Sequence, residues 1–65
     1  MIGKLAKEIL GVELRVTVLE SRAGFYLGTQ DNGVPVSRES EEYFVDRNVA
    51  EAALRSGKFT QRINP

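Results

Sequence analysis

Apolar residues near the start of the chain recur three and four positions apart, which is the spacing of one helical face. The members of this pattern are Ile2, Leu5, Ala6, Ile9 and Leu10. Gly11 follows where such a helix would end. The pattern predicts a short amphipathic helix over residues 2–10, with an extended lead-in to the first strand as the alternative. A helix this short is not stable alone in water, so it must dock on this domain or on a partner.

Strict alternation of apolar and polar residues follows the predicted helix. One face carries Val12, Leu14, Val16 and Val18, and the other carries Glu13, Arg15 and Thr17. This period of two predicts a strand over residues 12–18 with one buried and one solvated face. Leu19 breaks the alternation, and residues 21–24 are typical of a turn.

Residues 24–36 have the pattern of a β-hairpin. Asn32-Gly33 tolerates the positive φ angles that tight hairpin turns require, and the first arm is expected over residues 25–29. Gly28 within that arm indicates a bulge or a close approach of another backbone. Pro35 cannot donate to a ladder, which places the second arm at a sheet edge.

The last element is predicted to be a helix over residues 47–56. Asp46 is a good N-cap, Gly57 is a typical stop signal, and the apolar stripe between them consists of Val49, Ala50, Ala53 and Leu54. Strand character at Tyr43-Phe44-Val45 precedes this helix. Residues 61–65 are expected to form a frayed tail.

The elements therefore follow the order α-β-β-β-α. We expect an α+β fold in which a three-stranded antiparallel β-meander carries the C-terminal helix on one face. At 65 residues the chain has room for one domain. Its expected parts are a short amphipathic helix at 1–11, the sheet at 12–45, a helix at 46–57 and a tail at 58–65.

Composition narrows the chemistry that is open to this chain. It contains neither cysteine nor histidine, which removes thiol chemistry, disulfides, the usual general base and the usual zinc ligand. We therefore expect no enzyme activity, no metal and no cofactor. The charges cancel, with nine basic and nine acidic residues, which disfavours nucleic acid as a partner and favours self-association. Without a transmembrane run or signal peptide, the expected location is cytoplasmic, with no membrane partner.

Three carboxylates lie close together at Glu39, Glu41 and Glu42. Paired carboxylates perform acid–base chemistry when one of them is desolvated. The more common interpretation is a solvated strand edge whose charges discourage further pairing. We interpret this segment as such an edge, or as a loop.

Arginines and tyrosines around the hairpin form the candidate interaction surface. Such residues dominate binding hot spots because they bury much area at a low cost in entropy. The candidate set is Arg15, Thr17, Arg22, Tyr26, Arg38 and Tyr43. The alternative is a set of ordinary surface arginines paired with Glu13, Glu20 and Glu39.

Three strands followed by an aromatic residue and the alanine-rich segment Asn48–Leu54 also suggest a family. Residues 12–56 resemble the small DNA-binding domains at the N-termini of phage-type tyrosine integrases and of AP2-type plant factors. In those domains the sheet face opposite the helix enters the major groove, which would place Arg15, Arg22 and Arg38 on DNA. The order α-β-β-β-α is also similar to that of double-stranded RNA-binding domains, but the lysine-rich start of their second helix is absent.

The sequence thus predicts a small non-catalytic interaction module, a bacterial or phage accessory protein that acts by protein–protein contact. A homodimer is compatible with its zero net charge. The alternative is a DNA-binding module that uses the sheet face.

Overall fold

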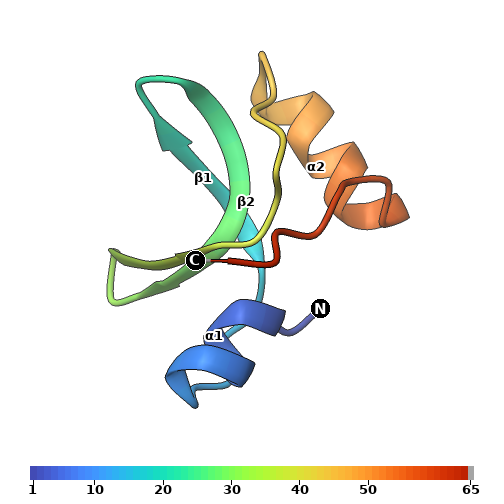
Figure 1. Ribbon diagram of the computed structural model, residues 1–65. Helices are drawn as coiled ribbons and strands as arrows, with labels where there is room; N and C mark the ends of the chain where they lie inside the picture. Colours follow the sequence, from blue (N-terminus) through green and yellow to red (C-terminus); the bar gives the residue numbers. More distant parts are fainter. Residues whose placement is uncertain (65) are drawn as a thin grey trace.

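The computed structural model describes residues 1–64 and has the predicted α+β architecture, with the order α-β-β-β-α (Figure 1). The three strands form an open antiparallel sheet in the order β1-β2-β3. The elements are α1 (Lys4–Leu10), β1 (Thr17–Ser21), β2 (Gly24–Asp31), β3 (Val34–Arg38) and α2 (Arg47–Ser56). No helix in this described part is long and apolar enough to span a membrane.

The first strand begins later than the alternation predicts. β1 starts at Thr17 rather than at Val12 and continues to Ser21. Its ladder with β2 ends at the pair of Thr17 and Gly28. The preceding residues 14–16 pair instead with residues 1–3, through Gly3 N–H to Leu14 O and Val16 N–H to Met1 O, both 2.8 Å.

The β2–β3 hairpin confirms the prediction made from Asn32-Gly33. Both residues have positive φ angles, 52° and 82° respectively. The irregularity in the ladder falls between Thr29 and Gln30, and not at Gly28. Gly28 instead marks the other predicted possibility, a close backbone approach, because a Cβ atom there would collide with the Ser37 carbonyl oxygen.

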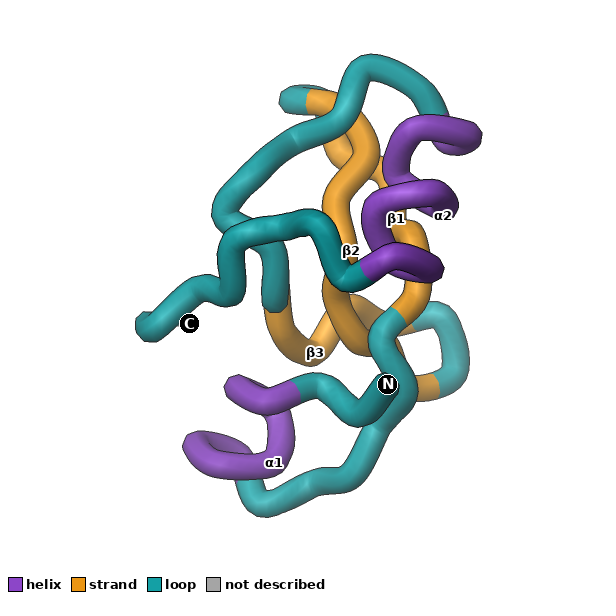
Figure 2. Tube along the Cα trace, turned by 90° about the vertical axis from the view of Figure 1, so that its right-hand side faces the viewer, coloured by secondary structure: helices purple, strands orange, loops and turns teal. Residues whose placement is uncertain are grey.

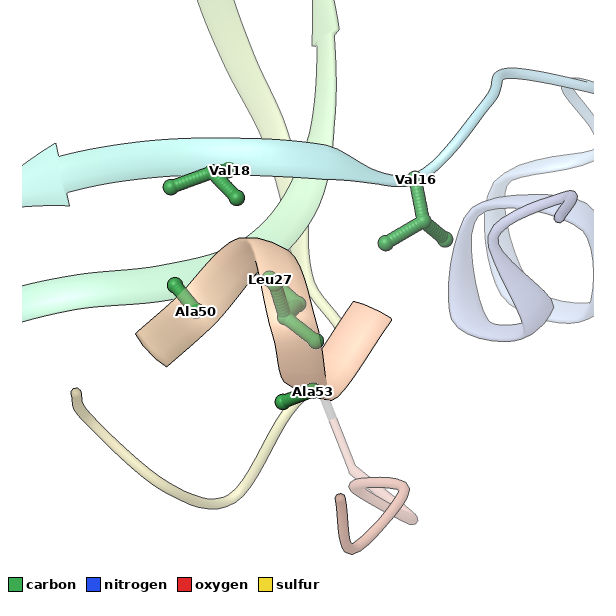
Figure 3. Packing of buried hydrophobic residues seen from close by; sticks show 5 residues of the cluster. All are labelled: Val16, Val18, Leu27, Ala50 and Ala53. Atoms are coloured by element: carbon green, nitrogen blue, oxygen red, sulfur yellow. The ribbon is translucent and has the colours of Figure 1, made fainter. Parts of the chain in front are cut away.

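Helix α2 covers the half of the sheet that is formed by β1 and β2. The Asp46 side chain accepts a 2.8 Å hydrogen bond from Val49 N–H and caps its first turn. Two small side chains on its inner face, Ala50 and Ala53, allow the helix to approach the sheet closely. They pack with Val16, Val18 and Leu27 in the main apolar core (Figure 3).

Helix α1 docks on this domain, against β3, at the other end of the molecule from α2 (Figure 2). It starts at Lys4 rather than at Ile2, because residues 1–3 extend along residues 14–16. Only Leu5 and Ala6 are buried, whereas Ile9 and Leu10 remain about half exposed. The apolar stripe that predicts the helix is therefore only partly covered.

The C-terminal segment is not frayed as far as Arg62, contrary to expectation. Gln61 forms a β-bridge with Ser40, and Arg62 N–H donates to Glu39 O at 2.7 Å. The Arg62 side chain also makes an ion pair with Glu41 at 3.4 Å. The position of this segment is fixed because it forms hydrogen bonds and an ion pair with the residues that follow β3. Of the predicted tail, Pro65 lies outside the described residues.

Candidate interaction surface

One face of the sheet is free of helices. Because residues directly opposite one another in an antiparallel pair share a face, the pairing places Thr17, Gly28 and Arg38 in one row across the sheet and Leu19 beside Tyr26. Val18 and Leu27, which pack under α2, point the other way. We call the helix-free side the open face; its strand side chains are those of Thr17, Leu19, Ser21, Tyr26 and Arg38.

Three of the six candidate residues come together on the open face. The Arg38 guanidinium carbon lies 4.4 Å from the centre of the Tyr43 ring, and Arg38 Nη1 donates to Tyr43 Oη at 2.6 Å. The Tyr43 and Tyr26 rings meet edge to face, with their centres 6.0 Å apart. Tyr43 is 42% exposed. We call Arg38, Tyr43 and Tyr26 the Arg–Tyr cluster.

The remaining donors of Arg38 hold the loop after β3. Its Nε donates to Ser40 O and its Nη2 to Glu41 O, both at 2.9 Å. Because every nitrogen of the guanidinium has an acceptor, its position is fixed by the fold. The cluster thus presents an aromatic surface that Arg38 supports through hydrogen bonds to neutral acceptors.

Because Gly28 has no side chain, the Tyr26 ring can occupy the space beside it. A Cβ atom at Gly28 would lie 3.0 Å from Tyr26 Cε2, so the ring covers the bare backbone of its neighbour on the same face. The close approach predicted at Gly28 therefore shapes the open face directly.

The other three candidates lie apart from the cluster. Thr17 is on the open face, separated from Arg38 by Gly28. Arg15 is exposed just before β1, and Arg22 is exposed in the β1–β2 turn. Neither arginine makes an ion pair within residues 1–64, where Arg62–Glu41 is the one pair found. The pairing of surface arginines with Glu13, Glu20 and Glu39 is therefore wrong.

Glu39 is the main residue that the sequence interpretation misplaced, because it lies in the interior and not at a solvated edge. Its side chain is 0% exposed. One carboxylate oxygen accepts from Leu5 N–H at 2.9 Å and Gln61 Nε2 at 2.8 Å. The other accepts from Ala6 N–H at 3.1 Å and Ser37 Oγ at 2.6 Å. Four donors therefore satisfy one buried carboxylate, with an arrangement that suits a structural role.

Helix α1 has no local side-chain cap at its N-terminus, which is the one indirect sign that a distant residue must satisfy its first turn. The N-cap residue is Gly3, which has no side chain to satisfy the free amides of the first turn. Glu39 takes that role from a distant position. Gly3 also permits the approach, since a Cβ atom there would lie 2.8 Å from Glu39 Oε2.

Acid is expected to destabilise the protein through Glu39. Burial alone would raise the pKa of Glu39, but the hydrogen bonds from Ser37, Leu5, Gln61 and Ala6 outweigh it and hold the pKa below its ordinary value of 4.5. A carboxyl whose pKa is lower in the folded state stabilises that state above its unfolded pKa and loses this effect as the pH falls. The free energy of unfolding should therefore be constant near neutrality and fall below pH 4.5.

Urea unfolding followed by circular dichroism across this pH range measures the effect. Glu42 contributes in the same direction: burial opposes the shift, but Thr60 N–H donates to both carboxylate oxygens and lowers the pKa of Glu42. The variants Glu39→Gln and Glu42→Gln separate the two contributions, and Glu39→Gln should give the shallower dependence on pH. Stability that stays constant or rises below pH 4.5 would contradict the assignment.

Comparisons with known proteins found no match to a protein-family model, to a curated protein or to a solved structure. Within the described residues no group of three or more acidic side chains is placed to hold a metal ion. The functional argument therefore rests on the open face and its Arg–Tyr cluster.

Proposed function

We propose that this chain is a small non-catalytic module that binds a partner protein with the open face of its sheet. The absence of histidine and cysteine from the sequence supports a binding role over a catalytic one. The observation that carries the proposal is the Arg–Tyr cluster, which the fold holds rigid on the one sheet face that neither helix covers.

Rigidity is what makes this cluster suitable for binding. Tyrosine rings that are already fixed by stacking and hydrogen bonds lose little entropy when a partner covers them. Tyr43 is held by Arg38 and by Tyr26, and Arg38 is in turn held by two loop carbonyl groups. A partner would thus meet a preformed surface.

The chemistry of the open face indicates the kind of partner. The strand side chains of this face are aliphatic, aromatic or hydroxylic apart from Arg38, and none is a carboxylate. Each nitrogen of the Arg38 guanidinium already donates one hydrogen bond within the domain, while Arg15 is exposed next to β1. These features fit a protein surface that brings apolar groups to the tyrosines and a carboxylate to Arg15.

Site-specific photo-crosslinking tests the proposal. A photoreactive phenylalanine analogue at position 43, introduced in the source cell, should capture a partner protein. The purified partner should then bind wild-type chain, and Tyr43→Ala should weaken that binding roughly 30-fold, as expected of a hot-spot residue. Val45→Ala is the matched control, because Val45 is 87% exposed and two residues away, and it should leave the affinity unchanged. Failure to capture a partner, or equal affinity in both variants, would overturn the proposal.

DNA binding by the same face is the second candidate function. It is supported by the two exposed arginines, Arg15 and Arg22, and by the sheet face opposite the helices. This hypothesis requires that the chain bind duplex DNA with an affinity that falls steeply as the salt concentration rises. It also requires that Arg15→Glu abolish the binding. Those results would identify DNA, and not a protein, as the partner. If duplex DNA shows no mobility shift at low salt, the DNA-binding hypothesis is wrong.

A further inference from the structure

The outer edge of β1 has backbone groups that no other part of the described chain pairs with. β1 is an edge strand of the sheet. The backbone groups of Phe25 and Leu27 bond the chain on the β3 side, through Phe44 and Glu39 respectively. Since backbone groups alternate between the two sides of a strand, the intervening residues of β2 bond β1.

This alternation fixes which groups of β1 point outward. The β2 residues that bond β1 are Gly24, Tyr26 and Gly28, and their partners are Ser21, Leu19 and Thr17. Val18 and Glu20 therefore turn their N–H and C=O groups to the outer edge. The Val16 N–H independently confirms the direction, because it bonds Met1 O on that same edge at 2.8 Å.

We propose that a second copy of this chain pairs with β1 across a two-fold axis at Leu19. In this antiparallel pairing, Val18 of one copy lies opposite Glu20 of the other, so their outward groups exchange four hydrogen bonds in total. The pairing joins two three-stranded sheets into one sheet of six strands. It uses the edge of β1 and does not depend on the function proposed for the open face.

The lengths of the two strands match this arrangement. On one side the free edge ends at Val16, whose N–H is taken by Met1. In the two-fold pairing the residue opposite Thr17 is Ser21 of the second copy, which is the last residue of β1 before the turn at Arg22 and Ala23. The incoming strand therefore turns away where the edge is already occupied.

Two further features favour a second copy as the occupant of this edge. The zero net charge of the chain removes net repulsion between copies. Helix α2 packs on both β1 and β2, so in this two-fold pairing the two copies of α2 would stand on the same face of the joined sheet. The outer edge of β3 is less suitable for pairing with a second copy, because β3 contains Pro35 and α1 packs against it.

Cysteine crosslinking tests both the dimer and its register, since the chain has no cysteine of its own. Leu19→Cys places two thiols opposite each other in a non-hydrogen-bonded pair, within the Cα distance that a disulfide requires. Thr17→Cys is the matched control, because its thiols would lie about 14 Å apart along the strands. Mild oxidation should link the first variant into dimers and leave the second monomeric. Equal linking in both variants, or in neither, would overturn the proposal.

Sedimentation velocity of the unmodified chain gives an independent measurement. The 7.2 kDa chain should sediment as a concentration-dependent dimer. Glu20→Pro removes the outward N–H and should abolish dimerisation, whereas Glu20→Ala removes the same charge but keeps the N–H and should preserve it. Circular dichroism establishes that both variants fold. A wild-type chain that is monomeric at every concentration, or dimers that persist in a folded Glu20→Pro variant, would contradict the pairing.

Discussion

Replacing Glu39 with alanine is expected to lower the free energy of unfolding by about 3 kcal/mol or more. The change removes the acceptor of four hydrogen bonds at once: those of Leu5 N–H, Ala6 N–H, Ser37 Oγ and Gln61 Nε2. It also leaves a cavity, since Glu39 is among the largest fully buried side chains. A loss of this size is a large part of the stability of so small a domain. Urea unfolding at neutral pH measures it.

Two further variants determine whether the network causes the loss. Glu41→Ala removes a carboxylate only two residues away, but that group is half exposed and makes one ion pair with Arg62 at 3.4 Å, so its loss should cost less than about 1 kcal/mol. Glu39→Gln keeps the shape but turns an amide donor toward groups that are themselves donors, and should fall between the two. If Glu39→Ala were no more destabilising than Glu41→Ala, the structural role of Glu39 would be wrong.

Replacing Gly28 with alanine is expected to destabilise the protein by about 2 kcal/mol. The new methyl group would collide with the backbone oxygen of Ser37 and meet Tyr26 Cε2 at 3.0 Å. A backbone oxygen in a paired strand cannot move without disturbing the β2–β3 ladder. The direction of the change is itself informative, because alanine normally stabilises a strand relative to glycine by about 0.5–1 kcal/mol.

Thermal and urea unfolding of Gly28→Ala, together with its near-ultraviolet circular dichroism, measure both consequences. The aromatic signal should change because the Tyr26 ring loses its position over Gly28. The matched control is Thr17→Ala, which removes side-chain atoms from the residue directly opposite Gly28 and should cost less than about 1 kcal/mol. An alanine at position 28 that stabilised the protein would contradict the close approach.

The sequence predicts the parts of the fold that local residues specify. Asn32-Gly33 requires only its own positive φ angles to form the turn, and Asp46 requires only the first turn of α2 to act as a cap. Both signals act within four residues, so no knowledge of the remaining fold is needed. The order of the elements follows from such local signals.

What the sequence does not reveal depends on contacts between distant segments. The polar segment after β3 has the composition of a solvated edge, yet Glu39 is buried because an uncapped helix and Gln61 both meet it there. β1 starts only at Thr17 because its ladder with β2 ends at Gly28, while residues 14–16 pair with the distant residues 1–3. The alternation of apolar and polar residues predicts a strand, but it does not predict which segment that strand will pair with.

The candidate site likewise has one part that the sequence predicts and another part that it does not predict. Choosing Tyr26, Arg38 and Tyr43 from their residue types led to three side chains that the structure brings into contact. Their mutual geometry could not be predicted, because it depends on how the loop after β3 folds back on Arg38 through the carbonyls of Ser40 and Glu41. Arg15 and Arg22 lie outside that loop and remain separate.

The distant cap of α1 also constrains the order in which the chain folds. The carboxylate that satisfies Leu5 N–H lies 34 residues further along the sequence, so a nascent chain reaches it only after both hairpins have been synthesised. Until that long loop closes, this seven-residue helix lacks both the carboxylate that caps its first turn and the strand that it packs on. Helix α1 therefore becomes stable only after β3 and Glu39 have been synthesised and have packed against it.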